Sequence, residues 1–347
     1  MDVISFSSAS AERRRAMLRT ALGPAIAGAL LDAHVLEIMV NPDGALRLDI
    51  LGRGRVDTGV SLNPEQIERI IRLVASHART EVHGDAPIVS AELPPSAEGR
   101  AGERFEGVLP PVSTAPCFSI RKPAERLHTL DDYVADGIAT VAAADLLRAA
   151  VARRDNILVA GGTSSGKTTL ANALLAEMAS ADERVILIED TRELQSPAAD
   201  TVALRTRPGS VSMADLVRST LRLRPDRIIV GEVRGPEALD MLKAWNTGHP
   251  GGIATVHANG ALRALFRIEQ LVQEAVVTVP RELIAAAIDT IVFISGRGLH
   301  RRVSSIARVN GLDAHGAYAL TDLLNTSDPQ GDGMKAVETD AGAGGAR

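Results

Sequence analysis

Residues 156–175 read NILVAGGTSSGKTTLANALL, and this stretch decides the fold that we expect for the chain. Asn156 to Ala160 forms an apolar run with the length of a buried strand, and the residues from Thr168 onward form a helical pattern. Between them, GGTSSGKT fits the spacing G-x-x-x-x-G-K-[ST]. A strand, a glycine-rich loop and a helix in this order predict a loop that wraps around phosphate groups.

Each residue type in this loop has a physical reason. Glycines let the backbone turn tightly, so that successive N–H groups face a phosphate, and the helix N-terminus adds its positive end. Lys167 neutralises phosphate charge, and the hydroxyl of Thr168 suits Mg²⁺. The alternative is an ordinary glycine-rich turn, which the flanking strand and helix disfavour. We therefore expect ATP and Mg²⁺ to bind at Gly161, Gly162, Thr163, Ser164, Ser165, Gly166, Lys167, Thr168 and Thr169.

The chain around this loop alternates helical patterns with short apolar runs. The runs after the loop are RVILIED, RIIVGE and GIATVHA, which begin at residues 184, 227 and 252. Continuous apolar strands between helices predict a mainly parallel sheet that is buried on both faces. After TIVFISGR, residues 290–297, we expect a smaller strand-rich ending.

The first third of the chain has a different pattern. LEIMVNPDGALRLDI, residues 36–50, predicts a hairpin around an Asn-Pro-Asp-Gly turn. NPEQIERIIRLVASHA predicts a helix, with Asn63 as its cap and Pro64 at its first position. We expect an α+β domain over 1–122, a linker over 123–135, an α/β domain over 136–324 and a disordered tail over 325–347.

Acidic residues follow two of the predicted parallel strands, at the edge where open α/β sheets bind ligands. Glu189 and Asp190 end one strand and Glu232 follows another. Gly231 stands where a metal-binding aspartate is expected beside a P-loop, so Glu232 has to act as the metal-side acid, as the base that polarises water, or as both. The alternatives are a solvated carboxylate for Glu232 and a helix cap for EDTRE, residues 189–193.

Four motifs in order carry a resemblance to a known family. They resemble the motifs of the secretion traffic ATPases of type II and type IV systems, particularly the conjugal-transfer branch. The first two are GGTSSGKTTLANALL and IEDTREL, and the segment from Leu221 to Asn259 contains the other two, a Walker-B box and a histidine box. The similar region runs from about Leu130 to Ala275, and the upstream EIMVNPDG, RFEGVLPPV and FSIRKP are also similar to that family. The resemblance implies a RecA-like P-loop domain preceded by a smaller α+β domain.

The resemblance also implies roles for the residues after the loop. Glu189 belongs to an acidic box, Glu232 is the Walker-B glutamate, and His257 ends a strand that faces the γ-phosphate, with Thr255 on the same strand face. His249 is expected to be a loop residue. A purely structural His257 is the alternative, and a zinc site on the two histidines is disfavoured because they lie eight residues apart without a cysteine partner.

The family forms hexameric rings in which the N-terminal domain folds over the nucleotide and supplies arginines. This implies that Arg104 and Arg121 stabilise charge during hydrolysis, although surface ion pairs are the alternative. Four further arginines flank the Walker-B strand and are candidates for contacts with a neighbouring subunit. They are Arg222, Arg224, Arg227 and Arg234.

The composition excludes several other classes. The net charge is −5 and aromatic residues make up 2%, which disfavours a DNA translocase and a reader of single strands. Residues 11–35 imitate a secretory signal, but Pro24 and Asp32 interrupt the pattern, so an amphipathic helix is expected. No run reaches the roughly 18 apolar residues of a membrane span. We expect a cytoplasmic chain that binds peripherally to the inner membrane.

Two rival functions stay open at this point. One is a motor for type II secretion or for pilus extension and retraction; a single cysteine leaves no four-cysteine zinc insertion of the kind found in such motors. The other is a scaffold that binds ATP, assembles and hardly turns it over. We expect other secretion-system components as partners and no sequence-specific binding of nucleic acid.

Overall fold

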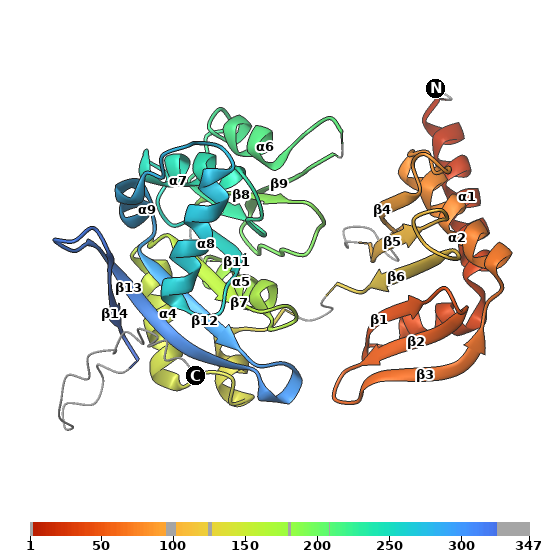
Figure 1. Ribbon diagram of the computed structural model, residues 1–347, viewed down its shortest axis with the longest axis horizontal. Helices are drawn as coiled ribbons and strands as arrows, with labels where there is room; N and C mark the ends of the chain where they lie inside the picture. Colours follow the sequence, from red (N-terminus) through yellow and green to blue (C-terminus); the bar gives the residue numbers. More distant parts are fainter. Residues whose placement is uncertain (1–2, 95–101, 124–126, 180–181, 208, 325–347) are drawn as a thin grey trace, which may run out of the picture.

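The computed structural model describes residues 3–94, 102–123, 127–179, 182–207 and 209–324. These residues form two sheets, one from each part of the sequence (Figure 1). The N-terminal part contains α1 Val3–Leu31, β1 Val35–Val40, β2 Ala45–Ile50, β3 Gly54–Ser61, α2 Pro64–Ala78, β4 Ile88–Glu92, β5 Arg104–Val108 and β6 Cys117–Arg121. The expected tail, 325–347, lies outside the described residues.

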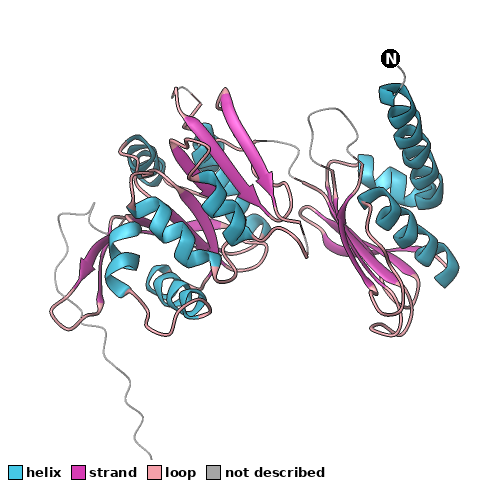
Figure 2. Cartoon of the chain, turned by 90° about the horizontal axis from the view of Figure 1, so that it is seen from above, coloured by secondary structure: helices cyan, strands magenta, loops and turns pink. Residues whose placement is uncertain are grey.

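The N-terminal sheet has the order β3-β2-β1-β6-β5-β4 and is antiparallel throughout. The predicted hairpin is present as β1 and β2, and α2 begins as expected. The Asn63 side chain accepts from the Gln66 amide, the Gln66 side chain accepts from the Asn63 amide, and Pro64 opens the helix. Helices α1 and α2 cover one face of this sheet (Figure 2).

Helix α1 buries one stripe of side chains and is broken once. Leu18, Leu22, Ile26 and Ala29 are buried at helical spacing, which confirms the amphipathic pattern of this segment. The break lies at Gly23, which has a φ of 70° directly before Pro24. Among the described residues, no helix combines the length and the apolar character that a membrane span requires.

The C-terminal part alternates helices with strands and ends in a hairpin. Its elements are α3 Leu130–Ala135, α4 Val141–Ala152, β7 Ile157–Gly161, α5 Lys167–Ala176, β8 Arg184–Glu189, β9 Asp200–Arg205, α6 Met213–Thr220, β10 Arg227–Val230, α7 Glu237–Asn246 and β11 Ile253–His257. The chain continues with α8 Ala261–Gln273, α9 Arg281–Ala287, β12 Thr290–Ser295, the 3₁₀ turn η1 Gly298–His300, β13 Arg302–Leu312 and β14 Tyr318–Asp322.

The C-terminal sheet has the order β14-β13-β12-β7-β11-β10-β8-β9. The six strands from β12 to β9 are parallel, and β13 and β14 add an antiparallel pair at one edge. Alternate residues of β7 enter different cores: Leu158 and Ala160 pack with α7 and α8, while Ile157 and Val159 pack with α4 and α5. The predicted double-sided burial is confirmed, and the strand-rich ending extends the same sheet.

The expected linker over 123–135 is too long at its C-terminal end. Leu130 and Tyr133 of α3 are buried in the core that also holds Leu147 of α4. Thr129 caps α3 by accepting from the Asp132 amide. The helix has only six residues, several of them polar, so the sequence pattern did not predict it. Residues 124–126 lie outside the described residues, so the connection that remains is short.

The turn GHPGG, residues 248–252, is explained by packing. The Trp245 ring is buried, its Nε1 donates to the Ile228 carbonyl at 3.1 Å, and a side chain at Gly252 would meet Nε1 at 2.0 Å. Gly251 has a φ of 86° and lies against the Arg227 guanidinium. The two glycines therefore bring β11 close to α7, as the predicted packing role of Trp245 requires.

Candidate functional site

The glycine-rich loop lies between the fully buried β7 and the start of α5. Ser164 and Gly166 adopt positive φ values of 61° and 93°, which turn the backbone back on itself. A side chain at Gly161 would meet Ser165 Oγ at 2.5 Å and the Ile294 carbonyl at 2.6 Å. The sequence pattern thus has a steric basis here, because only glycine fits between the loop and β12.

Features of the loop suit a bound phosphate. The first turn of α5 has no side-chain cap, so its backbone N–H groups are available to an anion. Ser165 Oγ is buried without a hydrogen-bond partner in the part of the chain that the structure describes. Thr168 lines the adjoining cavities, where its hydroxyl is placed to serve as a Mg²⁺ ligand. The residues present therefore fit a Mg²⁺-bound nucleotide.

Lys167 is the buried cation of the loop. Its side chain is 8% exposed, and its Nζ donates to the Gly162 carbonyl at 3.1 Å. The same ammonium lies 3.3 Å from both ring nitrogens of His257. Burial lowers the pKa of Lys167, and the carboxylate of Glu232 opposes that shift. The P-loop is thereby linked directly to the strand that ends in His257.

Glu189 lies at the end of β8 as a buried carboxyl group. It is 4% exposed, and its Oε1 accepts from the Glu193 and Leu194 amides at 2.9 and 2.8 Å. Burial raises the pKa of Glu189 to about 7. A side chain at Gly231 would meet the Glu189 side chain at 3.0 Å. The glycine that stands here in place of the expected aspartate therefore leaves space for the Glu189 side chain.

The raised pKa of Glu189 predicts a pH dependence of stability. A carboxyl group whose pKa rises from 4.5 to about 7 on folding stabilises the protein below pH 4.5, and this contribution is lost as the pH rises through 7. For the protein without nucleotide, we expect the free energy of unfolding to fall by about 2–3 kcal/mol between these limits relative to Glu189→Gln. Urea titrations at a series of pH values measure this difference. A constant difference between the two proteins would show that folding does not shift the pKa of Glu189.

Glu232 is held in a charged network on the loop after β10. Its Oε2 lies 2.5 Å from Arg234 Nη2, and its Oε1 lies 2.8 Å from His257 Nε2. Burial alone would raise the pKa of Glu232, but Arg234, His257 and Lys167 together bring it below the ordinary value. The carboxylate is therefore charged and faces the P-loop lysine.

His257 is at the end of β11, in register with Gly161 of β7. Its side chain is 43% exposed, and burial, followed by the charge of Lys167, lowers the pKa of His257. A weakly basic imidazole between a lysine and a glutamate responds to any added charge. Thr255, two residues earlier on the same strand, is buried, and its hydroxyl donates to the Gly231 carbonyl at 2.7 Å, which links β11 to the loop after β10. His249 contacts the Pro225 carbonyl in a loop, as expected.

The two N-terminal arginines come together through strand register. Arg104 of β5 is paired with Arg121 of β6, and both alternate with residues that face the helix-covered core, Phe105 and Ile120. They therefore point away from α1 and α2. The charge of Arg121 acts on Lys167, and Arg104 lines a cavity with P-loop and acidic residues. An ion pair between Glu92 and Arg205 joins the two sheets beside this point.

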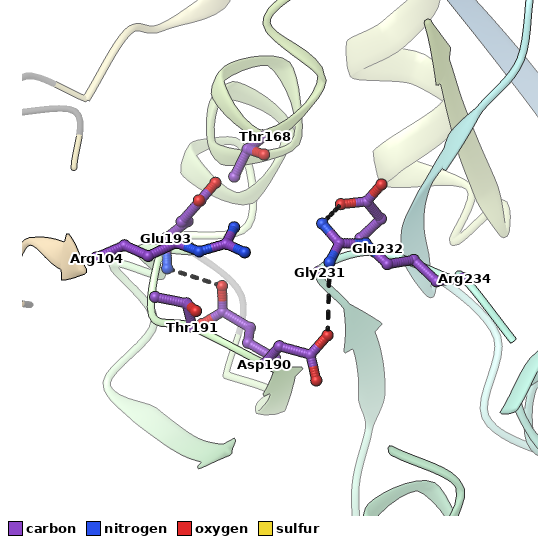
Figure 3. A pocket seen from close by; sticks show the side chains of 9 residues that line it. Arg104, Thr168, Asp190, Thr191, Glu193, Gly231, Glu232 and Arg234 are labelled. Atoms are coloured by element: carbon purple, nitrogen blue, oxygen red, sulfur yellow. Dashed lines mark hydrogen bonds and ion pairs between the residues drawn. The ribbon is translucent and has the colours of Figure 1, made fainter. Parts of the chain in front are cut away.

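Two adjoining hollows surround the loop. The first, of about 380 Å³, is bounded by Arg104, Thr168, Glu189, Glu193 and Glu232 among others, with Arg104 pointing into it (Figure 3). The second is an open cleft of about 630 Å³ between the P-loop and the β1–β2 side of the N-terminal sheet, and Arg121 lines it. Ligand clefts usually enclose about 300–1,000 Å³, so this cleft has the size that a nucleotide needs.

Of the four arginines that flank β10, the structure overturns one candidate. Arg227 is 4% exposed and bonds to Glu183 and to the Val151 carbonyl, so it cannot reach a neighbouring subunit. The alternation of β10 places its side chain inward beside the half-buried carboxylate of Glu183. Arg222 and Arg224 are exposed, whereas Arg234 pairs with Glu232 of its own chain.

Two residues of the site were not predicted from the sequence. The Arg301 guanidinium lies against Gly166 of the P-loop, and Glu193 lines both hollows. No local pattern marks Arg301, because it lies 135 residues after Gly166 in a turn with ordinary loop composition. Only the pairing of β12 with β7 brings the two together.

The fold and the site define an α/β protein with a glycine-rich loop of P-loop sequence at the carboxyl edge of its parallel strands. The chain belongs to the family of type II/IV secretion system proteins, whose family model matches residues 55–322. This confirms the resemblance drawn from the motifs.

Individual relatives agree with this family. The chain is 49% identical over 296 residues to the conjugal transfer protein TrbB of Rhizobium radiobacter, over 85% of this chain and 90% of that protein. It is 35% identical over 319 residues to the type IV secretion system protein PtlH of Bordetella pertussis, over 81% and 92%. The structure of the pilus retraction motor PilT with bound ADP shares the fold, with a TM-score of 0.57, 20% identity and coverage of 88% and 81%.

Proposed function

We propose that this protein is a Mg²⁺-dependent ATP hydrolase that powers conjugative type IV secretion, in pilus assembly, substrate transfer or both. The observation that carries the proposal is the meeting of three motifs at one point: Lys167 of the P-loop contacts His257, which in turn contacts Glu232. Lys167 begins the helix after β7, Glu232 follows β10 and His257 ends β11, so all three lie at the same edge of the parallel strands in the domain that we assign as RecA-like. This domain was expected over residues 136–324, and α3 extends it to Leu130. Membership of the secretion family and the similarity to TrbB give the biological direction.

Each side chain has a defined task in hydrolysis. The loop amides and Lys167 hold the phosphate chain, and the Thr168 hydroxyl would help to hold a Mg²⁺ ion that would supply further neutralisation of phosphate charge. Glu232 accepts a proton from the attacking water, whose oxygen bonds to the γ-phosphorus while the bond to the β–γ bridging oxygen breaks. ADP and phosphate are the products. Glu189 supports the water from the neighbouring strand, and His257 senses the γ-phosphate through its contacts with Lys167 and Glu232.

Exposed arginines support the ring arrangement that we propose. Arg104 and Arg121 stabilise the charge that develops on the phosphate, and Arg222, Arg224 and Arg234 are candidates for contacts in a hexamer. An arginine at the transferring phosphate raises hydrolysis rates by about 10³–10⁵ in other P-loop enzymes. We place the hexamer in the cytoplasm at the inner membrane, bound peripherally to other secretion components. The N-terminal sheet with its helices forms the separate domain that moves over the nucleotide.

One observation favours a second candidate function. Glu232 is engaged by Arg234 at 2.5 Å, so it has to leave this ion pair before it can accept a proton. A chain in which that pair stays closed would bind ATP and assemble as a nucleotide-gated scaffold with little turnover. A motor for type II secretion or for pilus extension and retraction would use the same nucleotide site with other partners, and the single cysteine of this chain leaves no four-cysteine zinc insertion of the kind found in such motors.

The test measures ATP hydrolysis per subunit over a wide range of protein concentration, with Glu232→Gln as the blank. For a hexameric enzyme, the specific activity is expected to rise with protein concentration from near zero to a plateau, because neighbouring subunits complete the site. Sedimentation in the same buffers shows whether the rise coincides with assembly. Activity at the level of the blank in the fully assembled protein would instead favour the scaffold.

A further inference from the structure

The turn between β12 and β13 brings basic side chains to the P-loop. Strand β12 runs parallel to β7, with Ile294 in register with Gly161, so both strands end at the same edge of the sheet. Figure 1 shows this turn on the side of the C-terminal sheet that faces β1–β3. Arg297, His300 and Arg301 line the wide cleft together with Ser164 and the start of α5.

Arg301 is the member of this group that touches the loop. A side chain at Gly166 would place its first carbon 2.8 Å from Arg301 Nε and 2.9 Å from Cζ. Gly166 also has a φ of 93°, so both the backbone and the available space require glycine. The guanidinium occupies the space that any larger residue at position 166 would need.

The charge of Arg301 has no counterpart among the described residues. No ion pair with an acidic side chain is present there, and its Nε is buried without a hydrogen-bond partner. The nearby Tyr133 hydroxyl, on which the charge of Arg301 acts, is also buried without a partner. An arginine is always charged, and a buried donor without an acceptor is costly. This cation is therefore positioned by packing at a place where an anion would satisfy it.

We propose that Arg301 binds the α- and β-phosphates of the nucleotide, which makes it a determinant of affinity for ADP and ATP alike. The proposal rests on the proposed function, since it names a further residue of the same site. In a P-loop the backbone amides hold the α- and β-phosphates, while the lysine reaches the β- and γ-phosphates. Arg301 contacts that backbone at Gly166, whereas Lys167 lies with His257 and Glu232. A guanidinium presents paired donors that match phosphate oxygens.

The experiment measures the dissociation constants of ADP, ATP and AMP for Arg301→Gln in the full-length protein. We expect ADP and ATP to bind about tenfold or more weakly, by the same factor, because one charge-assisted contact is lost. AMP, which lacks the β-phosphate, is expected to lose less. Arg302→Gln is the matched control: it removes the same charge from the next residue, which is exposed and outside the cleft, and is expected to bind all three nucleotides normally.

Different results separate the possibilities. Normal ADP binding by a folded Arg301→Gln overturns the proposal, and so does a loss restricted to ATP, which would assign Arg301 to the γ-phosphate. If the glutamine variant does not fold, Arg301→Lys tests the same point, since lysine keeps the positive charge but lacks the paired donors of the guanidinium. Its affinity for ADP and ATP should then lie below that of the wild type. Wild-type protein that binds neither ADP nor ATP would reject the proposed function itself.

Discussion

Replacing Lys167 with alanine is expected to weaken ADP and ATP binding by about a hundredfold or more. Lys167 is the buried cation of the P-loop, and its ammonium is held between the Gly162 carbonyl and His257, where the phosphates are expected. A charge-assisted contact in such a site contributes about 1.5–3 kcal/mol, and the lysine makes more than one. Titration with a fluorescent ADP analogue, followed by competition with ATP, measures the loss.

Lys243→Ala is the control for this variant, because Lys243 is exposed on α7, far along the chain from the loop. It is expected to leave both affinities unchanged. The melting temperature of Lys167→Ala should stay close to that of the wild type, since Glu232 keeps its pairs with Arg234 and His257. Retained nucleotide affinity in a folded Lys167→Ala would show that the phosphates bind elsewhere.

Replacing Glu232 with glutamine is expected to reduce the rate of ATP hydrolysis by about 10²–10⁴ while ATP binding is retained. Glutamine has nearly the same shape as glutamate but cannot accept a proton from water. The charged carboxylate of Glu232 faces Lys167 and His257, with its pKa below the ordinary value. Single-turnover hydrolysis with protein in excess measures the chemical step without product release.

Asp240→Asn provides a comparison for Glu232→Gln, because it removes one carboxylate of a paired side chain on α7, outside the P-loop motifs. It should hydrolyse ATP at the wild-type rate. The roles assigned to Lys167 and Glu232 differ in kind, and the two variants should differ accordingly. If Glu232→Gln loses ATP binding to the same degree as Lys167→Ala, the glutamate holds the metal or the nucleotide, and its role as a proton acceptor is rejected.

Local patterns account for the parts of the fold that were predicted well. The strand–loop–helix around Gly161 to Thr168, the hairpin of β1 and β2, and the Asn63 cap of α2 all depend on residues close together in sequence. The alternation of apolar runs with helices predicted a sheet covered on both faces, and cores on both faces of the C-terminal sheet confirm it. Short-range steric rules and periodicity suffice for such features.

The missed features depend on contacts between distant residues. Helix α3 is too short to show a period, and its buried Leu130 and Tyr133 hold it in place. Arg227 reads as one of several exposed arginines until Glu183 is found beside it. Arg301 has no sequence signal at all, since its position follows from how β12 pairs with β7.

The sequence by itself predicted a glycine-rich loop of P-loop spacing that begins at Gly161 and parallel strands after it. It also placed Glu189 and His257 at the ends of two of those strands and Glu232 just after a third. Tertiary structure alone decided that Glu189 is buried with a pKa of about 7, that Glu232 is paired with Arg234 and His257, and that Arg104 lies beside Arg121. The reason is physical: backbone preferences act over a few residues, whereas burial, charge pairing and strand register arise only when segments far apart in the chain pack together.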